Sequence, residues 1–242
     1  MSQPMAKTRA LLLAGGLGTR LRPLTETTPK CLIPLAGRPM LDYWLDALEA
    51  AGIDAALLNT HHLRDAVKTW LDAANAGRRV QISEAYEPEL LGSAGTVAAN
   101  RGWADGVDTV LVIYADNLST IDLSAFLAFH EAHDDPFTMA LFHAPNPRAC
   151  GIATLDGDAR ITAFTEKPDE PPSDLANAGL YILDAAAWRE IADMGVFDFG
   201  FDVLPRFVGR MRGFVHEGYH RDIGTPESLA QANADLADGS VR

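Results

Sequence analysis

Three closely spaced glycines and two cations near the start of the chain form the segment best suited to chemistry. The stretch Leu11-Leu-Leu-Ala-Gly-Gly-Leu-Gly-Thr-Arg20 is followed ten residues later by Lys30. Glycines let a backbone approach a ligand closely, and the exposed amide N–H groups of such a loop form a concavity that binds anions. The guanidinium of Arg20 adds a fixed charged fork, and an ammonium such as that of Lys30 offsets the charge where two phosphates meet. The segment predicts a polyphosphate site.

Two common phosphate loops do not fit this spacing. The Walker loop needs Gly-Lys followed by Ser or Thr, whereas Gly18 precedes Thr19-Arg20. The dinucleotide fingerprint needs a glycine three places after its second one, and Leu21 holds that place after Gly18. A nicotinamide-dependent enzyme is therefore disfavoured.

Strands that alternate with helices must position this loop. The run Ala10–Ala14 predicts a buried strand that enters the glycine turn, and apolar residues recur at helical spacing from Met40 to Leu48, before Gly52. Further strands are expected at 55–59, 79–84, 109–115, 138–143, 152–155, 161–166 and 178–183, and helices at 63–74 and 93–101.

This order predicts an α/β fold with a Rossmann-like, mixed but mostly parallel central sheet and helices on both faces. We expect a single domain over residues 1–242, with a nucleotide-binding half at about 1–120 and a second half at about 121–242. Asp116 directly follows the apolar strand that ends at Ala115, so it should lie at the carboxyl end of the sheet, where open α/β folds bind ligands.

Composition excludes several classes of protein. A formal net charge of −13 argues against a nucleic-acid binder, yet residues 1–40 hold six Lys or Arg and one acidic residue, as a site for small polyanions requires. No apolar run approaches the ~20 residues of a membrane-spanning helix. Cys31 and Cys150 are too few for a disulfide framework or zinc site, and the seven histidines show no metal-ligand spacing. With no secretory pattern at its start, the chain is expected in the cytoplasm.

Five motifs in order resemble the sugar-1-phosphate nucleotidylyltransferase family, from Arg9 to about Leu236. The first is the glycine loop with its later Thr28-Pro-Lys30. The others are Leu90-Leu-Gly-Ser-Ala-Gly95, Phe164-Thr-Glu-Lys-Pro168, Asn177-Ala-Gly179 and Asp222-Ile-Gly-Thr-Pro226. The resemblance implies an enzyme that transfers a nucleoside monophosphate from a triphosphate to a sugar 1-phosphate and releases pyrophosphate.

The resemblance also implies roles for individual residues. Arg20 and Lys30 match the catalytic cations, and Asp116 and Asp222 match the ligands of Mg²⁺, an ion that takes one or two carboxylates together with phosphate and water. The nucleotide would be bound by Leu13, Ala14, Gly15, Gly16, Gly18, Thr19, Gly92 and Gly95. The sugar phosphate would be bound by Gly151, Glu166, Lys167 and Asn177, which makes the half at about 121–242 the sugar-binding half.

The choice of substrates is more open. The compact chain and its Leu-Gly-Ser-Ala-Gly segment resemble guanylyltransferases that use mannose 1-phosphate or heptose 1-phosphate, which favours GTP. Compact N-acetylmuramate-1-phosphate uridylyltransferases are also similar, and thymidylyl or cytidylyl transfer remains open. Glu84 and Glu87 are both candidates to accept hydrogen bonds from the base. Cys150 replaces a tyrosine that usually touches the sugar, which leaves the sugar undetermined.

The alternative to an enzyme is a non-catalytic regulatory subunit that binds nucleotide sugar. It is disfavoured because the four charged residues of the implied catalytic site are all present. Nucleic acid and membrane partners are not expected, and the oligomeric state is not readable from the residues.

Overall fold

The computed structural model of the chain describes residues 7–241, and the chain folds into two compact units. Unit 1 comprises the chain up to Arg9, Leu91–Val112 and Ser124–Glu217; unit 2 comprises Ala10–Leu90, Ile113–Leu123 and the chain from Gly218 onward. Strands β1 (Thr8–Leu13) and β6 (Thr109–Tyr114) contribute residues to both units. The expected single domain with halves meeting near residue 120 stays a prediction.

Unit 2 is built on parallel strands that end at the same edge. From Ala10 onward β1 pairs with β4 (Ala55–Thr60), which pairs with β5 (Gln81–Tyr86). On the other side of β1 lies the end of β6, where the Ala115 amide donates to the Leu13 carbonyl at 3.0 Å. Strands β1, β4 and β6 are mainly apolar and buried because neighbouring strands and helices cover them, whereas β5 buries only Ile82.

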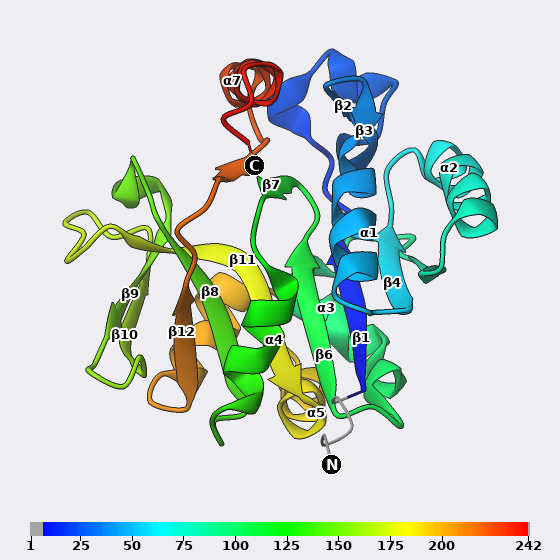
Figure 1. Cartoon of the computed structure of the whole chain (residues 1–242). Coiled ribbons are helices and arrows are strands. Elements are labelled where there is room, and N and C mark those ends of the chain that lie inside the picture. The colour runs from blue at the N-terminus through cyan, green and yellow to red at the C-terminus, as the bar shows by residue number, and fades with distance from the viewer. Residues whose placement is uncertain (1–6, 242) are drawn as a thin grey trace. The chain divides into compact units, whose positions relative to one another are not determined.

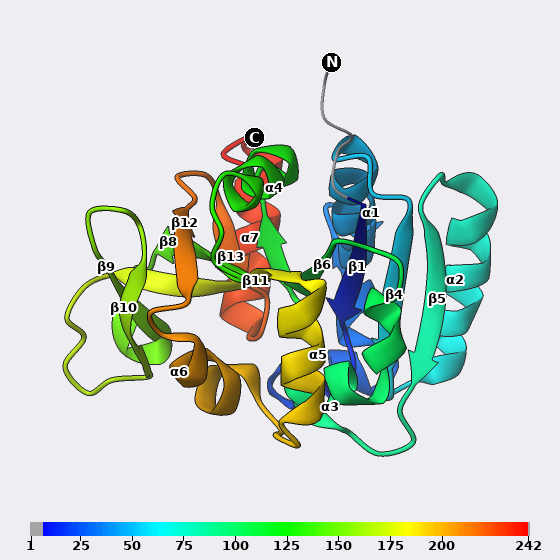
Figure 2. The same cartoon turned by 90° about the horizontal axis from the view of Figure 1, so that it is seen from below.

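Two helices follow the first strands of unit 2 (Figures 1 and 2). The helix α1 (Met40–Ala50) buries Met40, Leu41, Trp44, Leu45 and Leu48, and it is followed by Gly52 with a φ of +75°. The helix α2 (Arg64–Gly77) lies beside β5 and buries only Val67 and Leu71. A two-residue hairpin of β2 (Pro34–Leu35) and β3 (Arg38–Pro39) precedes α1.

The carboxyl-terminal segment completes unit 2. Strand β13 (His220–Asp222) pairs antiparallel with β7 (Asn117–Ser119), which directly follows β6. The final helix α7 (Pro226–Ala237) begins after Thr225, whose hydroxyl accepts the Ser228 amide at 3.2 Å, as expected for an N-cap.

Unit 1 contains a mixed set of strands in the order β12-β8-β11-β9-β10. Strand β12 (Met211–Val215) is parallel to β8 (Phe137–His143), and the remaining pairs, formed by β8, β9 (Gly151–Leu155), β10 (Ile161–Glu166) and β11 (Leu175–Asp184), are antiparallel. The largest fully buried side chains include those of Trp188, Tyr181 and Phe137.

The helices of unit 1 are short. They are α3 (Gly92–Ala99), α4 (Leu123–Glu131), α5 (Ala185–Asp193) and α6 (Leu204–Phe207), the last preceded by a π-helical turn at Phe199–Val203. The fold class is therefore α/β with a mixed, mostly parallel sheet and helices, as predicted. Between residues 7 and 241 no helix has the length and apolar character needed to cross a bilayer.

Candidate active site

The glycine loop at the end of β1 is held in shape by close contacts. Gly18 has a φ of +60°, and its carbonyl accepts the Thr25 hydroxyl at 2.8 Å. A Cβ on Gly18 would lie 2.8 Å from Thr25 Cγ2, so only glycine fits there. Within residues 7–241 the amides of Gly16, Leu17 and Gly18 have no hydrogen-bond acceptor. The loop therefore presents free N–H groups, as a site for phosphate oxygens requires.

Two cations and two carboxylates of unit 2 form one cluster beside this loop. Lys30 Nζ lies 2.5 Å from Asp116 Oδ2 and 3.6 Å from Asp222 Oδ1. Arg20 Nη2 lies 3.6 Å from Asp222 Oδ2. Burial raises the pKa of Asp222, and the neighbouring Lys30 ammonium opposes that rise. The structure thus brings together all four residues that the resemblance assigned to catalysis and metal binding.

Strand pairing explains how Asp116 and Asp222, distant in sequence, come together. Asp222 pairs with Asn117 in the β7–β13 ladder, and the Ile223 amide donates to the Asp116 carbonyl at 3.0 Å. A Cβ on the adjoining Gly224 would lie 2.5 Å from Arg20 Nη2 and 2.7 Å from Asp222 Oδ2, so a side chain there would displace these two charged groups.

These two aspartates fit a divalent cation by their chemistry. Both carboxylates face one ammonium, so the position between them already accepts positive charge. Among the described residues there is no group of three or more His, Cys, Asp or Glu that could hold a metal. Two carboxylates suit Mg²⁺, which takes its other oxygens from phosphate and water, better than a metal held by protein ligands alone.

In unit 1, Glu166 lies between two glycines. A Cβ on Gly151 would lie 2.5 Å from Glu166 Oε2 and 2.5 Å from Phe164 Cζ, and one on Gly200 would lie 2.9 Å from Glu166 Oε2. Burial raises the pKa of Glu166 against the lowering effect of Lys167, and nearby Asp198 raises it further. A side chain at either glycine would therefore displace the half-buried Glu166 carboxylate.

The other residues expected at the sugar phosphate have different surroundings. The Lys167 ammonium lies 3.8 Å from Glu166 Oε1 and 5.9 Å from the Phe201 ring centroid, and its backbone has a φ of +48°. Asn177 donates to the Tyr181 hydroxyl at 2.8 Å and accepts the Gly179 amide at 2.9 Å. Its amide therefore orders the bulge in β11, and its expected contact with the sugar stays a prediction.

The glycines expected near the base lie at the start of α3. Gly92 has a φ of +76° and packs against the ring of Phe197, so a side chain there would collide with that ring. A Cβ on Gly95 would lie 3.1 Å from Leu91 Cβ. The intervening Ser93 accepts the Phe199 amide at 2.9 Å and donates to Asp198 at 3.3 Å. These bonds tie α3 to the segment that includes Gly200.

Asp198 and Gly200 both lie beside Glu166, and neither of them was identified from the sequence. The available signal was a glycine between two aromatic residues in Phe199-Gly-Phe201, which is weak without the strand register.

Glu84 and Glu87, the two candidates for the base, are both engaged within unit 2. Glu84 accepts two bonds of 2.8 Å from the Arg64 guanidinium, which together with the Thr60 hydroxyl lowers its pKa. Glu87 is 2% exposed and accepts from Asn59 at 3.1 Å. A ring nitrogen of His61 forms a hydrogen bond with the Glu87 carbonyl, and one of His62 forms a hydrogen bond with the Thr25 carbonyl. These histidines therefore stabilise the backbone.

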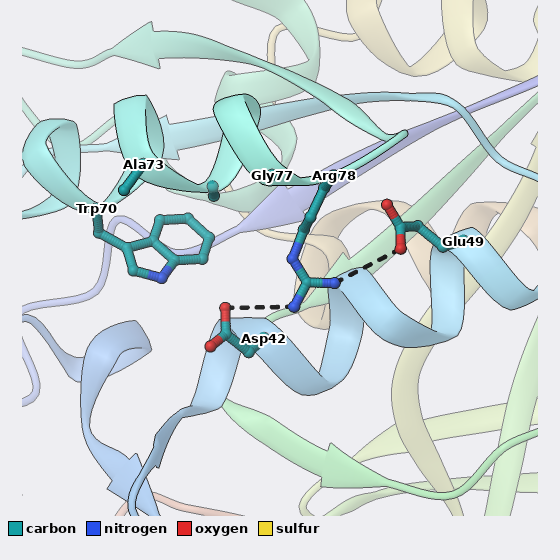
Figure 3. A pocket seen from close by; sticks show the side chains of 7 residues that line it. Asp42, Glu49, Trp70, Ala73, Gly77 and Arg78 are labelled. Carbon is teal, nitrogen blue, oxygen red and sulfur yellow. Dashed lines mark ion pairs between the residues drawn. The ribbon is translucent and has the colours of Figure 1, made fainter.

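A hollow of about 440 Å³ in unit 2 does not include any of the residues expected to bind substrate. It is lined by Asp42, Glu49, Trp70, Ala73, Ala74, Gly77 and Arg78 (Figure 3). The Arg78 guanidinium lies 2.6 Å from Asp46 and 3.7 Å from both Asp42 and Glu49, so it links the end of α2 to α1. We interpret this arrangement as structural.

Comparison with known proteins agrees with this fold. Residues 9–239 match the nucleotidyl transferase family, and the chain belongs to that family. The chain is 35% identical over 234 residues to the mannose-1-phosphate guanylyltransferase of Mycobacterium tuberculosis, and the match covers 95% of this chain and 65% of the relative. The chain thus spans less than two thirds of that relative's length.

Two solved structures extend the comparison. A putative glucose-1-phosphate thymidylyltransferase from Bacillus anthracis, in complex with a sucrose, aligns with a TM-score of 0.85 at 25% identity over 96% of both chains. HddC from Yersinia pseudotuberculosis, complexed with GMP-PN, aligns with a TM-score of 0.79 at 25% identity over 94% of this chain and 99% of the other.

Proposed function

We propose that this chain is an enzyme that transfers a nucleoside monophosphate to a sugar 1-phosphate. The observation that carries the proposal is the cluster of Arg20, Lys30, Asp116 and Asp222 beside a glycine loop with free amides. Membership in the nucleotidyl transferase family supports the same reaction class. A non-catalytic subunit would have no need to keep four mutually bonded charges next to a phosphate-binding loop.

The reaction needs no nucleophile from the protein. An oxygen of the sugar phosphate attacks the α-phosphorus of the triphosphate and forms the new P–O bond. The bond from the α-phosphorus to the bridging oxygen breaks on the opposite side, and pyrophosphate leaves with the electron pair. Catalysis of this kind depends on positioning and on charge that is neutralised in the transition state.

Each group of unit 2 has a part in that neutralisation. The amides after Gly15 and the residues Gly16, Gly18 and Thr19 bind the triphosphate, with Leu13 and Ala14 at the loop's entry. Arg20, which is largely exposed, binds the β- and γ-phosphates, and the nearly buried Lys30 ammonium binds the α-phosphate. Lys30 then exchanges its present carboxylate partners for the reacting phosphate.

We propose Mg²⁺ as the cofactor, held by Asp116 and Asp222. When bound, the ion supplies positive charge to the phosphates of both substrates. Two carboxylates that share one ammonium in the structure support this assignment.

The acceptor is assigned to residues of unit 1. Glu166 accepts hydrogen bonds from sugar hydroxyls, the Lys167 ammonium binds the phosphate, Gly151 leaves room for the sugar, and Asn177 contacts it. The close packing of the Glu166 carboxylate against Gly151 and Gly200, which have no side chains to displace it, supports this role. Gly92 and Gly95 are assigned to the nucleobase because they open α3 without a side chain.

GTP and mannose 1-phosphate are the substrates we propose, because a relative with 35% identity is named a mannose-1-phosphate guanylyltransferase. Heptose 1-phosphate is the second acceptor to test. We place the reaction in the cytoplasm, where such phosphorylated metabolites occur.

The test is pyrophosphate release with purified protein, Mg²⁺, each of GTP, UTP, dTTP and CTP, and a panel of sugar 1-phosphates. The panel contains mannose, glucose, heptose and N-acetylmuramate derivatives. The proposal expects release that needs both substrates and is fastest with GTP and mannose 1-phosphate. Binding of a triphosphate without turnover on any acceptor would favour the non-catalytic subunit instead.

A further inference from the structure

Asn59 lies where the glycine loop leaves the sheet. Its Oδ1 atom accepts the Ala14 amide at 2.5 Å and the Gly15 amide at 3.1 Å. The loop lies directly on this side chain, since a Cβ on Gly15 would be 2.8 Å from Asn59 Nδ2. Two consecutive amides at the loop's entry are therefore fixed by one oxygen.

The other end of the Asn59 amide is fixed as well. Its Nδ2 donates to Glu87 Oε1 at 3.1 Å, and Asn59 and Glu87 are 5% and 2% exposed. Glu87 Oε1 accepts a hydrogen bond here, so it faces the NH₂ group of Asn59, which is the donor of the amide. The oxygen of Asn59 is thereby turned toward the loop. Glu87 thus decides which way the amide points.

Strand register explains why these groups align. Leu58 of β4 pairs with Leu12 of β1, so Asn59 reaches the end of β1. Thr60 pairs with Tyr86 of β5, so Glu87 follows at the end of that strand, and its amide donates to the Thr60 carbonyl at 2.8 Å. A buried chain of hydrogen bonds thus crosses the carboxyl ends of three parallel strands and ends at the loop.

We propose that Asn59 and Glu87 are positioning residues for the triphosphate. Asn59 accepts the amides of Ala14 and Gly15 and so fixes the position of the loop relative to the end of β1. The next three amides, those of Gly16 to Gly18, are left for phosphate oxygens. Glu87 acts on the loop through its hydrogen bond to Asn59. The inference rests on the proposed function for its ligand, but its geometry lies wholly within unit 2.

An exchange of the two side-chain types tests this arrangement. Asn59→Asp keeps the shape and the acceptor for the loop but sets a carboxylate against buried Glu87. Glu87→Gln keeps an acceptor for Asn59. The double variant again pairs one amide with one carboxylate, but the carboxylate is now on residue 59 and the amide on residue 87. It should therefore recover the GTP binding that Asn59→Asp loses.

Asn75→Asp is the matched control. Asn75 accepts the Ile82 amide at 2.8 Å and donates to the Ile82 carbonyl at 2.9 Å, so it makes the same kind of bridge in unit 2 without contact to the loop. Thermal melting of every variant separates general loss of stability from the specific effect.

The readouts are GTP affinity by calorimetry, KM for each substrate, and amide hydrogen exchange of the peptide that contains Ala14 and Gly15. We expect Asn59→Asp to weaken GTP binding about tenfold or more, since a misplaced buried bond costs that much. In Asn59→Asp, KM for the sugar phosphate should change little, and amide hydrogen exchange of the loop should accelerate. The GTP affinity of the double variant should return to within about threefold of wild type. Asn75→Asp should alter only the melting temperature.

The inference is overturned if Asn59→Asp leaves the loop's exchange and GTP affinity at wild-type values, or if the double variant is no better than the single one. A wild-type protein that binds GTP but turns over no acceptor defeats the proposed function alone. If GTP does not bind at all, amide hydrogen exchange of the loop in wild type, the two single variants and the double variant still decides the role of Asn59 and Glu87.

Discussion

The Lys30 ammonium lies 2.5 Å from the Asp116 carboxylate, although the two residues are 86 positions apart in the sequence. Lys30 is 8% exposed, so its charge is largely removed from water and held by carboxylates. A buried ammonium is expensive unless it is paired, and the pairing keeps it ready for an anionic ligand. This relationship makes Lys30 the first residue to change.

Replacing Lys30 by alanine should lower turnover at least ~100-fold, because the transition state loses its direct positive charge. Pyrophosphate release under saturating substrates measures the effect. Lys68→Ala is the control, since Lys68 is exposed and its nearest carboxylate, Asp72, is 3.9 Å away on the same helix. An active Lys30→Ala protein would remove the basis of the proposed reaction.

Changing Asp222 to asparagine should raise the Mg²⁺ concentration needed for half-maximal rate. The substitution keeps the shape but removes one of two negative charges at the proposed ion, so we expect a shift of about tenfold or more. A magnesium titration of the rate gives the value, and Asp65→Asn, on the exposed start of α2, is the control. Equal titration curves for Asp222→Asn and wild type would exclude Asp222 as a ligand.

Gly151→Ala should impair the acceptor without affecting the triphosphate. The new methyl would lie 2.5 Å from Glu166 Oε2 and must push that carboxylate away, so KM for the sugar phosphate should rise about tenfold while KM for GTP stays the same. Gly157→Ala in the turn between β9 and β10 meets nothing within 4 Å and is the matched control. Similar kinetics for both variants would contradict the assignment of Glu166.

The protein should lose stability as the pH falls below neutral, in part through His130. Burial, together with the neighbouring His133, lowers the pKa of His130 from 6.5 to about 4. The unfolded chain therefore takes up this proton first, and stability falls between about pH 7 and pH 4 and levels off below.

The measurement is the free energy of unfolding from pH 8 to 5 for wild type and His130→Gln. One such proton contributes up to about 1.4 kcal/mol per pH unit, and that part of the slope should vanish in the variant. His133, whose pKa burial also lowers, and Asp135, held between Arg160 and Arg212, remain in both proteins. An unchanged slope would show that His130 does not carry the effect.

Much of the fold was predictable from periodicity alone. The apolar runs of β1, β4 and β6 predicted these strands to within two residues of their observed bounds, the strand expected at 161–166 coincides with β10, and Gly52 marked the end of α1. Strands β7 and β13 have three residues each, too short for any periodic signal, so their pairing could not be foreseen. The helices α4 and α5 were also missed, because the second half was interpreted mainly as strands.

The same limit applies to the candidate site. Residue types and motifs singled out Lys30 and Asp222, but the role of Asn59 depends on the register of three strands. An asparagine at the end of the apolar run Ala55–Asn59 was visible in the sequence, yet nothing there showed which backbone amides it would accept.

The β7–β13 ladder has a consequence for synthesis of the protein. Asp116 emerges from the ribosome 106 residues before Asp222, and only β13 brings the second carboxylate to the first. A nascent chain can therefore form the glycine loop and fold its first parallel strands early, while the carboxylate pair is still incomplete. Under the proposed function, the step assigned to the carboxylate pair cannot occur until translation has delivered β13.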